Sequence, residues 1–186
     1  MTRGSVIIRD AVPDDAEALL SIWKDFANPS TRSVPAVASA EQVVSAVLRL
    51  EADASERLLV AVVDDAVVGV VHLRRAPVSP IHDEDAVHLG YLHVLSSHRR
   101  RGVGRQFLEA AADWADEKGS AIVMASVAAS ARDSNRFLAR LGLTQVAVLR
   151  ACSVVQLRTR LSSAMTKSTR TNVVATRRLM RRARNA

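Results

Sequence analysis

The stretch His98-Arg99-Arg100-Arg101-Gly102-Val103-Gly104-Arg105-Gln106-Phe107-Leu108 lies between two segments of different periodicity. Residues 87–94 before it alternate as a strand does, and residues 104–118 after it carry apolar side chains at helical spacing. Gly119 follows as the expected C-cap of the helix. This order predicts a strand, a turn that contains Gly102 and Gly104, and then a helix.

Such a turn has the properties of an anion site. The first turn of a helix leaves backbone N–H groups unpaired, and the helix dipole is positive at that end. Glycines have no Cβ, so a phosphate can come close to the backbone. Four arginines surround the turn: Arg99, Arg100, Arg101 and Arg105. We therefore expect it to bind a pyrophosphate, and a tight turn in a basic surface patch is the alternative without a ligand.

Two other nucleotide-binding motifs do not match the stretch. A P-loop ends in Gly-Lys-Ser/Thr, whereas Gly104 is followed by Arg-Gln. The dinucleotide fingerprint Gly-x-Gly-x-x-Gly/Ala needs a small third residue, and Phe107 stands at that position. Neither an NTPase nor a dinucleotide-binding enzyme is favoured.

Three segments resemble the GNAT family of N-acetyltransferases. The pattern Arg-x-x-Gly-x-Gly at residues 99–104 resembles the acyl-CoA signature of that family. Residues 5–9, the turn around Pro13, and the helix that follows resemble its usual beginning, and Phe137-Leu-Ala-Arg-Leu-Gly-Leu143 resembles its closing signature. The resemblance spans about residues 5 to 158.

The resemblance implies an α/β fold with a mixed sheet of six or seven strands, flanked by helices and splayed between the fourth and fifth strands. The chain pattern gives helices at 13–26, 40–50, 104–118 and 130–142. It gives strands at 5–9, 57–63, 66–73, 86–94, 121–127, 144–150 and 152–158, of which 57–73 form a hairpin and 87–127 a right-handed parallel βαβ unit. We expect a domain at 1–158 and a basic tail at 159–186.

The resemblance also assigns acyl-CoA binding to particular residues. The backbone of the strand end would lie beside the pantetheine, and the backbone of the turn would take the pyrophosphate. Asn135 is a further candidate contact, with N-capping or loop support as its alternative role. The full set is Leu92, His93, Val94, Arg99, Arg100, Arg101, Gly102, Val103, Gly104, Arg105 and Asn135.

The acid–base residues are less well defined. Many family members supply an acid for the departing thiolate from a Tyr four residues before the closing Gly, where this chain has Leu138. Its one tyrosine, Tyr91, lies on the strand before the turn. A water relay is one candidate for the base, and the side-chain candidates are His88, His93, Glu84 and Asp85.

His88 is preferred slightly over His93 as the base. In a regular strand, residues five apart face opposite sides, so at most one of these two faces the acceptor unless a bulge intervenes. A hydrogen-bonded core histidine is the alternative for either. Glu84 belongs to an acidic run, 83–85, that would attract a cationic amine or serve as a solvated loop.

Composition limits the remaining possibilities. The 186 residues are 48% hydrophobic, which indicates one globular domain with an appendage. The one cysteine, Cys152, excludes an internal disulfide, and no residue spacing predicts a metal site. No apolar run is long enough for a membrane span, so we expect a cytoplasmic protein.

The basic net charge of +7 is concentrated at the C-terminal end. Residues 1–143 hold 16 Lys and Arg against all 19 Asp and Glu, whereas residues 144–186 hold 10 Lys and Arg and no acid. The tail therefore has three readings: a solvated appendage, a segment that docks on a second subunit of a homodimer, or an anchor for nucleic acid or anionic lipid. The first two are favoured, because the tail has no aromatic residue for base stacking.

The resemblance implies transfer of an acetyl group from acetyl-CoA to a primary amine of a small molecule or protein. One alternative is an acyl-CoA-binding sensor of the same fold without transfer activity. The other is a nucleic-acid-associated protein that uses the basic tail. The acceptor itself depends on loops 28–39 and 74–85, whose conformations the sequence leaves open.

Overall fold

The computed structural model describes residues 5–26 and 38–162, and its contacts divide the chain into a unit of residues 1–145 and a unit of residues 146–186. Most of the predicted loop at 28–39, and the predicted basic tail from residue 163 onward, lie outside the described residues.

A mixed sheet forms the centre of the first unit. Its strands are β1 (Ile7–Asp10), β2 (Glu56–Val63), β3 (Ala66–Pro77), β4 (Asp85–Val94) and β5 (Ile122–Ala125), in the spatial order β1-β2-β3-β4-β5. Neighbours from β1 to β4 are antiparallel, and β5 is parallel to β4. The predicted α/β class is confirmed, with five strands in the described part of the chain instead of six or seven.

The hairpin predicted at 57–73 is confirmed and extends further. Asp64 and Asp65 both adopt positive φ, 49° and 60°, as a two-residue turn between twisted strands requires. β3 continues to Pro77 because its last residues pair with the start of β4, where Arg75 Nε lies 2.7 Å from Asp85 Oδ2. The predicted end of the strand at residue 73 was too early. Residues 74–77 are held in the strand by cross-strand pairs with β4, which their own polar sequence does not indicate.

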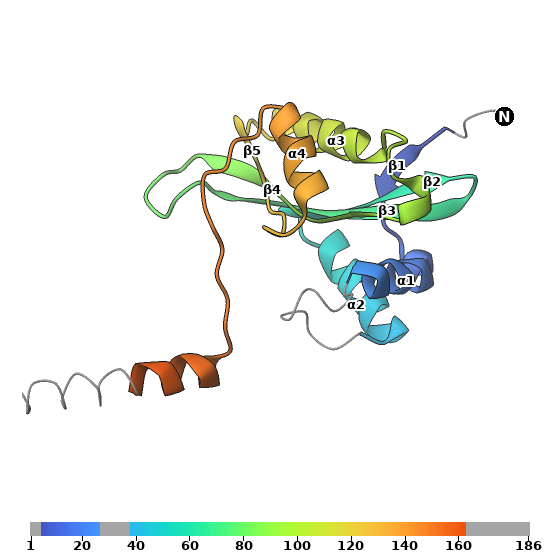
Figure 1. The fold of residues 1–186 in the computed structure, drawn as a ribbon. Coiled ribbons are helices and arrows are strands. Elements are labelled where there is room, and N and C mark those ends of the chain that lie inside the picture. Colours follow the sequence, from blue (N-terminus) through green and yellow to red (C-terminus); the bar gives the residue numbers. More distant parts are fainter. Residues whose placement is uncertain (1–4, 27–37, 163–186) are drawn as a thin grey trace, which may run out of the picture. The chain divides into compact units, whose positions relative to one another are not determined.

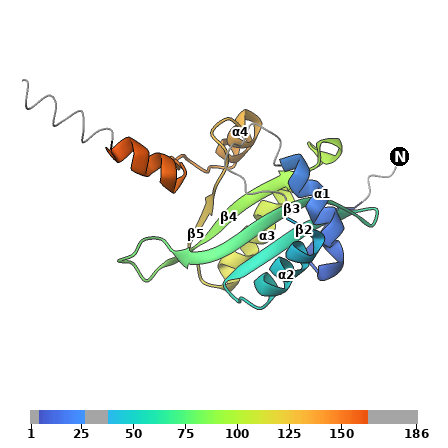
Figure 2. The same ribbon diagram turned by 90° about the horizontal axis from the view of Figure 1, so that it is seen from below.

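Helices cover both faces of the sheet (Figures 1 and 2). On one face lie α1 (Ala16–Phe26), which follows the short helix η1 (Pro13–Asp15), and α2 (Ala40–Glu51). On the other face lie α3 (Val103–Glu117) and α4 (Arg132–Arg140), and η2 (Ser96–His98) joins β4 to the α3 side. α2 begins with a capping box, in which Ser39 N donates to Gln42 Oε1 at 2.8 Å and Gln42 N donates to Ser39 Oγ at 3.3 Å.

Alternation along the strands sends apolar side chains to two separate cores. The larger core joins the sheet to α3, where Phe107 is fully buried. The smaller core joins the other face of the sheet to α1 and α2 through Ile22 and Val47. The parallel β4–α3–β5 arrangement predicted from the sequence is confirmed.

The predicted final strand pair, 144–150 and 152–158, is wrong. Residues 143–153 have no regular structure, and residues 154–162 are helical. A strand needs a partner edge, which local alternation does not supply. A helix needs only a local start: Gln156 N donates to Ser153 Oγ at 3.2 Å, and Ser153 N donates to Gln156 Oε1 at 3.4 Å. The domain boundary expected at residue 158 falls inside this helix.

Candidate functional site

The glycine turn joins β4 to α3, as the sequence predicted. Gly102 is the N-cap of α3 and has a φ of 88°, and Arg100 has a φ of 60°. Both values lie in the left-handed region, which glycine adopts without a steric penalty and other residues seldom adopt. The chain therefore reverses sharply before the helix begins.

This turn leaves backbone donors at the start of α3 without partners. Arg105 N and Gln106 N both donate to Gly102 O, at 2.9 and 3.1 Å. The N–H groups of Gly102, Val103 and Gly104 have no acceptor among the described residues. Unpaired N–H groups at the positive end of a fifteen-residue helix can bind an anion.

The two glycines differ in their surroundings. A Cβ at Gly102 would meet nothing within 4 Å, so the space beside this residue is open. A Cβ at Gly104 would lie 3.5 Å from Cε1 of Phe137, a residue of α4. Gly102 therefore leaves room for a ligand, whereas a Cβ at Gly104 would make an ordinary van der Waals contact with Phe137.

The arginines of the turn have different partners. Arg99 Nε donates to Val94 O at 2.9 Å, which ties the turn to the end of β4. Arg105 Nε lies 2.8 Å from Glu109 Oε1 on the exposed side of α3. Arg100 and Arg101 are exposed and have no ion-pair partner in the part of the chain that the structure describes. They leave the turn with positive charge available to an anion.

Beside this turn, β4 has an open edge. β5 pairs with β4 only over Ala86–Leu89, and Ser126 N makes the last contact by donating to Leu89 O at 2.8 Å. From residue 90 to residue 94, β4 has no strand partner on that side among the described residues. The backbone groups of Leu92 at this edge can therefore pair with an extended ligand.

A bulge in the same part of β4 changes which side chains share a face. The β3–β4 register shifts between Val70 and His72, and Tyr91 has a φ of 53°. Val87 and Leu89 before the bulge, and Leu92 and Val94 after it, all pack toward α3. His88 and His93 consequently both lie on the opposite face, which the expectation for a regular strand did not allow.

We call the sheet surface toward α1 and α2 the α1 face. Two histidine–carboxylate hydrogen bonds are made there: His93 Nε2 lies 2.7 Å from Asp25 Oδ2, and His72 Nε2 lies 2.8 Å from Glu56 Oε2. The rings of Trp23 and Tyr91 are 5.2 Å apart, centroid to centroid, and those of His72 and Tyr91 are 6.4 Å apart. Polar residues of the α1 face include Glu56, His72, His88 and His93, and Asp25 of α1 contacts His93.

Four of these residues were missed by the sequence analysis: Trp23, Asp25, Glu56 and His72. No motif marks them. For Glu56 and His72 the reason lies in the hairpin register: a regular hairpin around Asp64 and Asp65 would pair Arg57 with His72, whereas the register shift between Ala61 and Val62 pairs Leu58 with His72 and places Glu56 diagonally across from the histidine.

The predicted acid–base residues do not come together as one group. His88 and Tyr91 lie on either side of Gly90. His88 Nε2 is buried and has no hydrogen-bond partner among the described residues. Glu84 precedes the first residue of β4, seven residues from Tyr91 and therefore about 20 Å away along the strand.

Two residues near α4 bear on the predicted site. Asn135 Nδ2 donates to Ala128 O and Ala131 O, at 3.0 and 2.9 Å, so this amide group supports the loop before α4. Leu138, at the position of the family's tyrosine, is 5% exposed and packs in the interior.

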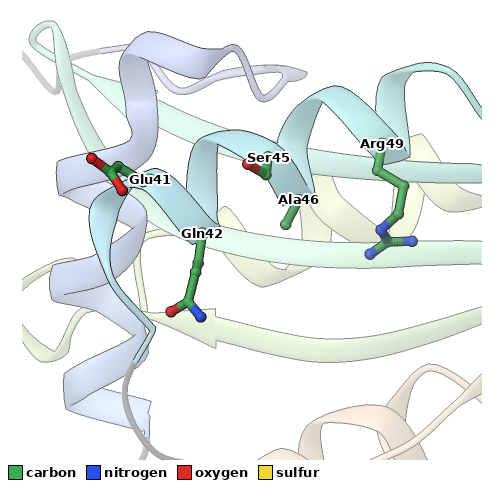
Figure 3. A pocket seen from close by; sticks show the side chains of 5 residues that line it. All are labelled: Glu41, Gln42, Ser45, Ala46 and Arg49. Carbon is green, nitrogen blue, oxygen red and sulfur yellow. The ribbon is translucent and has the colours of Figure 1, made fainter.

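Other features of the described residues mark no further site. Figure 3 shows an open depression whose five lining residues, Glu41, Gln42, Ser45, Ala46 and Arg49, all come from α2. None of them is a predicted site residue. No group of His, Cys, Asp and Glu in residues 5–26 and 38–162 could hold a metal ion, and no helix there could cross a membrane.

Comparisons with known proteins agree with this geometry. A family model described as the acetyltransferase (GNAT) family matches residues 18–143. No curated protein sequence matches the chain.

Several solved structures have the same fold, and this chain matches each of them over nearly its whole length. A transcriptional regulator from Bacillus halodurans C-125 is 21% identical with a TM-score of 0.70, over 80% of this chain and 99% of that one. An aminoglycoside N-acetyltransferase in complex with CoA is 16% identical with a TM-score of 0.66, over 82% and 96%. A ribosomal-protein-alanine N-acetyltransferase from Brucella melitensis biovar Abortus 2308 is 18% identical with a TM-score of 0.65, over 80% and 99%.

Proposed function

Because this chain belongs to the acetyltransferase (GNAT) family, we propose that it transfers an acetyl group from acetyl-CoA to a primary amine. The observation that carries the proposal is the open edge of β4, which leads directly to the unpaired N–H groups at the start of α3. An extended chain of amides ending in a pyrophosphate, as in CoA, is complementary to that arrangement.

Each part of the cofactor then has residues to hold it. Backbone groups at the edge of β4 pair with the pantetheine amides, and N–H groups at the start of α3 bind the pyrophosphate. Arg100 and Arg101 add positive charge, and the Asn135 side-chain oxygen is available to the cofactor. Acetyl-CoA supplies the activated acyl group. The proposed set is Leu92, His93, Val94, Arg99, Arg100, Arg101, Gly102, Val103, Gly104, Arg105 and Asn135.

The open edge also has a role in the chemistry. A backbone N–H directed at the thioester oxygen stabilises the negative charge that develops there when the amine attacks. Tyr91 lies at the bulge beside this edge and is the proton donor that we assign to the departing thiolate. A CoA thiolate leaves with little help, so the tyrosine adds a modest effect.

A primary amine is the acceptor class supported by the similar structures. Their names include aminoglycoside, ribosomal-protein-alanine and glucosamine-6-phosphate N-acetyltransferases, whose acceptors are all amines. Identities of 12–18% carry no individual acceptor over to this chain.

A second candidate function is an acyl-CoA-binding sensor without transfer activity. The buried Leu138 at the position of the family's tyrosine favours it. The similar structure described as a transcriptional regulator has the same fold and a name that specifies no acetyl transfer.

Mass spectrometry of acetylated products distinguishes the two functions. The purified chain is incubated with acetyl-CoA and one of three amines: sisomicin, a peptide with N-terminal alanine, or glucosamine-6-phosphate. We expect enzyme-dependent acetylation of at least one amine, and its loss in Gly102→Asp. Acetyl-CoA binding without acetylation of any of them would overturn the transferase proposal in favour of the sensor.

A further inference from the structure

The α1 face has an open space at Gly90. A Cβ added to this residue would meet no atom of the described residues within 4 Å. Gly90 does not have a positive φ, so its backbone conformation does not require a glycine. The absence of a side chain at Gly90 therefore leaves room on the α1 face, and the conformation of β4 does not explain it.

This space lies between the open edge of β4 and a histidine. In the β3–β4 register, Gly90 pairs with His72 on one side, and on its other side β4 has no strand partner among the described residues. Neighbouring strands are about 4.8 Å apart. An amine nitrogen above Gly90 would therefore be within reach of both His72 and a thioester that lies along the open edge.

Aromatic side chains flank the same space. Tyr91 follows Gly90 directly, its ring is 6.4 Å from that of His72, and Trp23 from α1 packs against Tyr91. Aromatic rings attract an ammonium group through their negative faces. Such surroundings suit an acceptor that arrives as a protonated amine.

His72 is arranged as a base by its bond to Glu56. When Nε2–H donates to the Glu56 carboxylate at 2.8 Å, the lone pair of the ring is on Nδ1, which has no hydrogen-bond partner among the described residues. The two side chains are only 24% and 19% exposed, so the pair is partly shielded from water. The carboxylate stabilises the imidazolium that forms when Nδ1 takes a proton.

Several other charged or titratable groups lie on the elements packed around His72. Arg74 follows on β3, Asp25 belongs to α1, and β4 contributes His88, Tyr91 and His93. Asp25 is hydrogen-bonded to His93, and the buried Nε2 of His88 has no hydrogen-bond partner among the described residues. Among these histidines, His72 is the one that both faces the space above Gly90 and is bonded to a largely buried carboxylate.

We propose that the acceptor ammonium binds above Gly90 and that His72, positioned by Glu56, takes its proton. This assignment rests on the acetyl transfer proposed above and replaces His88, the base preferred from the sequence. His72 Nδ1 accepts one proton from the ammonium, and the neutral nitrogen forms a bond to the thioester carbon. The C–S bond then breaks, Tyr91 donates its proton to the thiolate and regains one from the nitrogen, and His72 releases its proton to water.

The test measures kcat/KM against pH for the fastest of the three amines named above. His72→Gln should lower kcat/KM by about 100-fold or more near neutral pH. The defect should shrink as pH rises, because the amine then arrives already neutral. Glu56→Gln should lower kcat/KM by about tenfold or more while leaving acetyl-CoA binding unchanged, because the imidazole is no longer held with Nδ1 toward the amine. A purely structural role of His72 would not reproduce the recovery of activity at high pH.

Two further variants test the position of the amine. Gly90→Val should raise KM for the amine at least about tenfold while leaving acetyl-CoA binding within twofold, because it fills the space above β4 only. His82→Gln makes the same chemical change as His72→Gln on the exposed β3–β4 connection, and it should leave the shape of the pH profile unchanged whatever it does to acceptor choice.

The results separate this proposal from the proposed function. If wild type acetylates no amine, the acetyl transfer itself fails. If wild type is active and His72→Gln keeps the wild-type profile, or His88→Gln alone removes the acidic limb, the assignment of His72 is overturned while acetyl transfer stands.

Discussion

Gly69 is the residue whose substitution tests the packing behind the open edge most directly. It lies on β3 opposite Val94. A Cβ added there would lie 2.9 Å from the carbonyl oxygen of His93 and 3.2 Å from Cε2 of the fully buried Phe107. Real Cβ atoms do not approach a backbone oxygen so closely, so in Gly69→Ala the β4 backbone must move.

The expected cost follows from two opposing effects. Overpacking of this kind destabilises by about 1–3 kcal/mol. Replacing glycine also lowers the conformational entropy of the unfolded chain, which stabilises the folded state by about 0.4–1 kcal/mol. The net loss is therefore about 1–2 kcal/mol, which corresponds to a fall in Tm of about 2–8 °C for a domain of this size.

Gly90→Ala provides the matched control, because it makes the same change on the neighbouring strand where the added Cβ meets nothing within 4 Å. Its stability should equal or slightly exceed that of wild type. Both variants are compared by thermal and urea unfolding, followed by circular dichroism. If Gly69→Ala were as stable as Gly90→Ala, the close approach of β3 to the His93 carbonyl would be refuted.

Two further stability predictions concern the two sides of the sheet. The hydrogen bonds from Arg9, and to a lesser degree the N–H of Val12, lower the pKa of Asp15, so Asp15→Asn should cost about 1–3 kcal/mol at pH 7. Because the pKa of Asp15 is lower in the folded state than in the unfolded state, the ionised carboxylate stabilises the fold at pH values above its unfolded-state pKa, and this contribution is lost as pH falls through its folded-state pKa. Urea unfolding should therefore show that the stability deficit of Asp15→Asn shrinks below about pH 4. An equal deficit at pH 3 and pH 7 would contradict this. Phe107→Ala should cost about 3–5 kcal/mol in the same assay, because this side chain of α3 is 0% exposed in the core between α3 and the sheet, and a loss under 1 kcal/mol would show that the core is packed otherwise.

Features decided by local sequence could be predicted. The Asp64–Asp65 turn, the glycine turn before α3 and the helical spacing of α3 each depend on residues close together in the chain. The position of the candidate anion site follows from these features, and the fold class was implied by the family resemblance. The helix at 154–162 had an equally local signal, because Ser153 and Gln156 form a capping box that strand-like alternation concealed.

Features decided by contacts between strands could not be predicted. The bulge places a residue other than glycine, Tyr91, at positive φ, and it brings His88 and His93 to one face. The pair of Glu56 and His72 depends on the register of the hairpin, which is itself shifted between Ala61 and Val62. A one-residue change in register would send each of these side chains to the other face.

The central claim, that acyl-CoA binds at the start of α3, is tested most directly by calorimetric titration of acetyl-CoA into three proteins: wild type, Gly102→Asn and Gly102→Asp. The space beside Gly102 is open, and Asn and Asp are similar in size and in tolerance of positive φ, so the two variants differ mainly in charge. We predict saturable binding to wild type and an affinity for Gly102→Asp about tenfold or more below that for Gly102→Asn, because the carboxylate repels the pyrophosphate. Absence of binding to folded wild type, or equal affinities for the two variants, would contradict the claim.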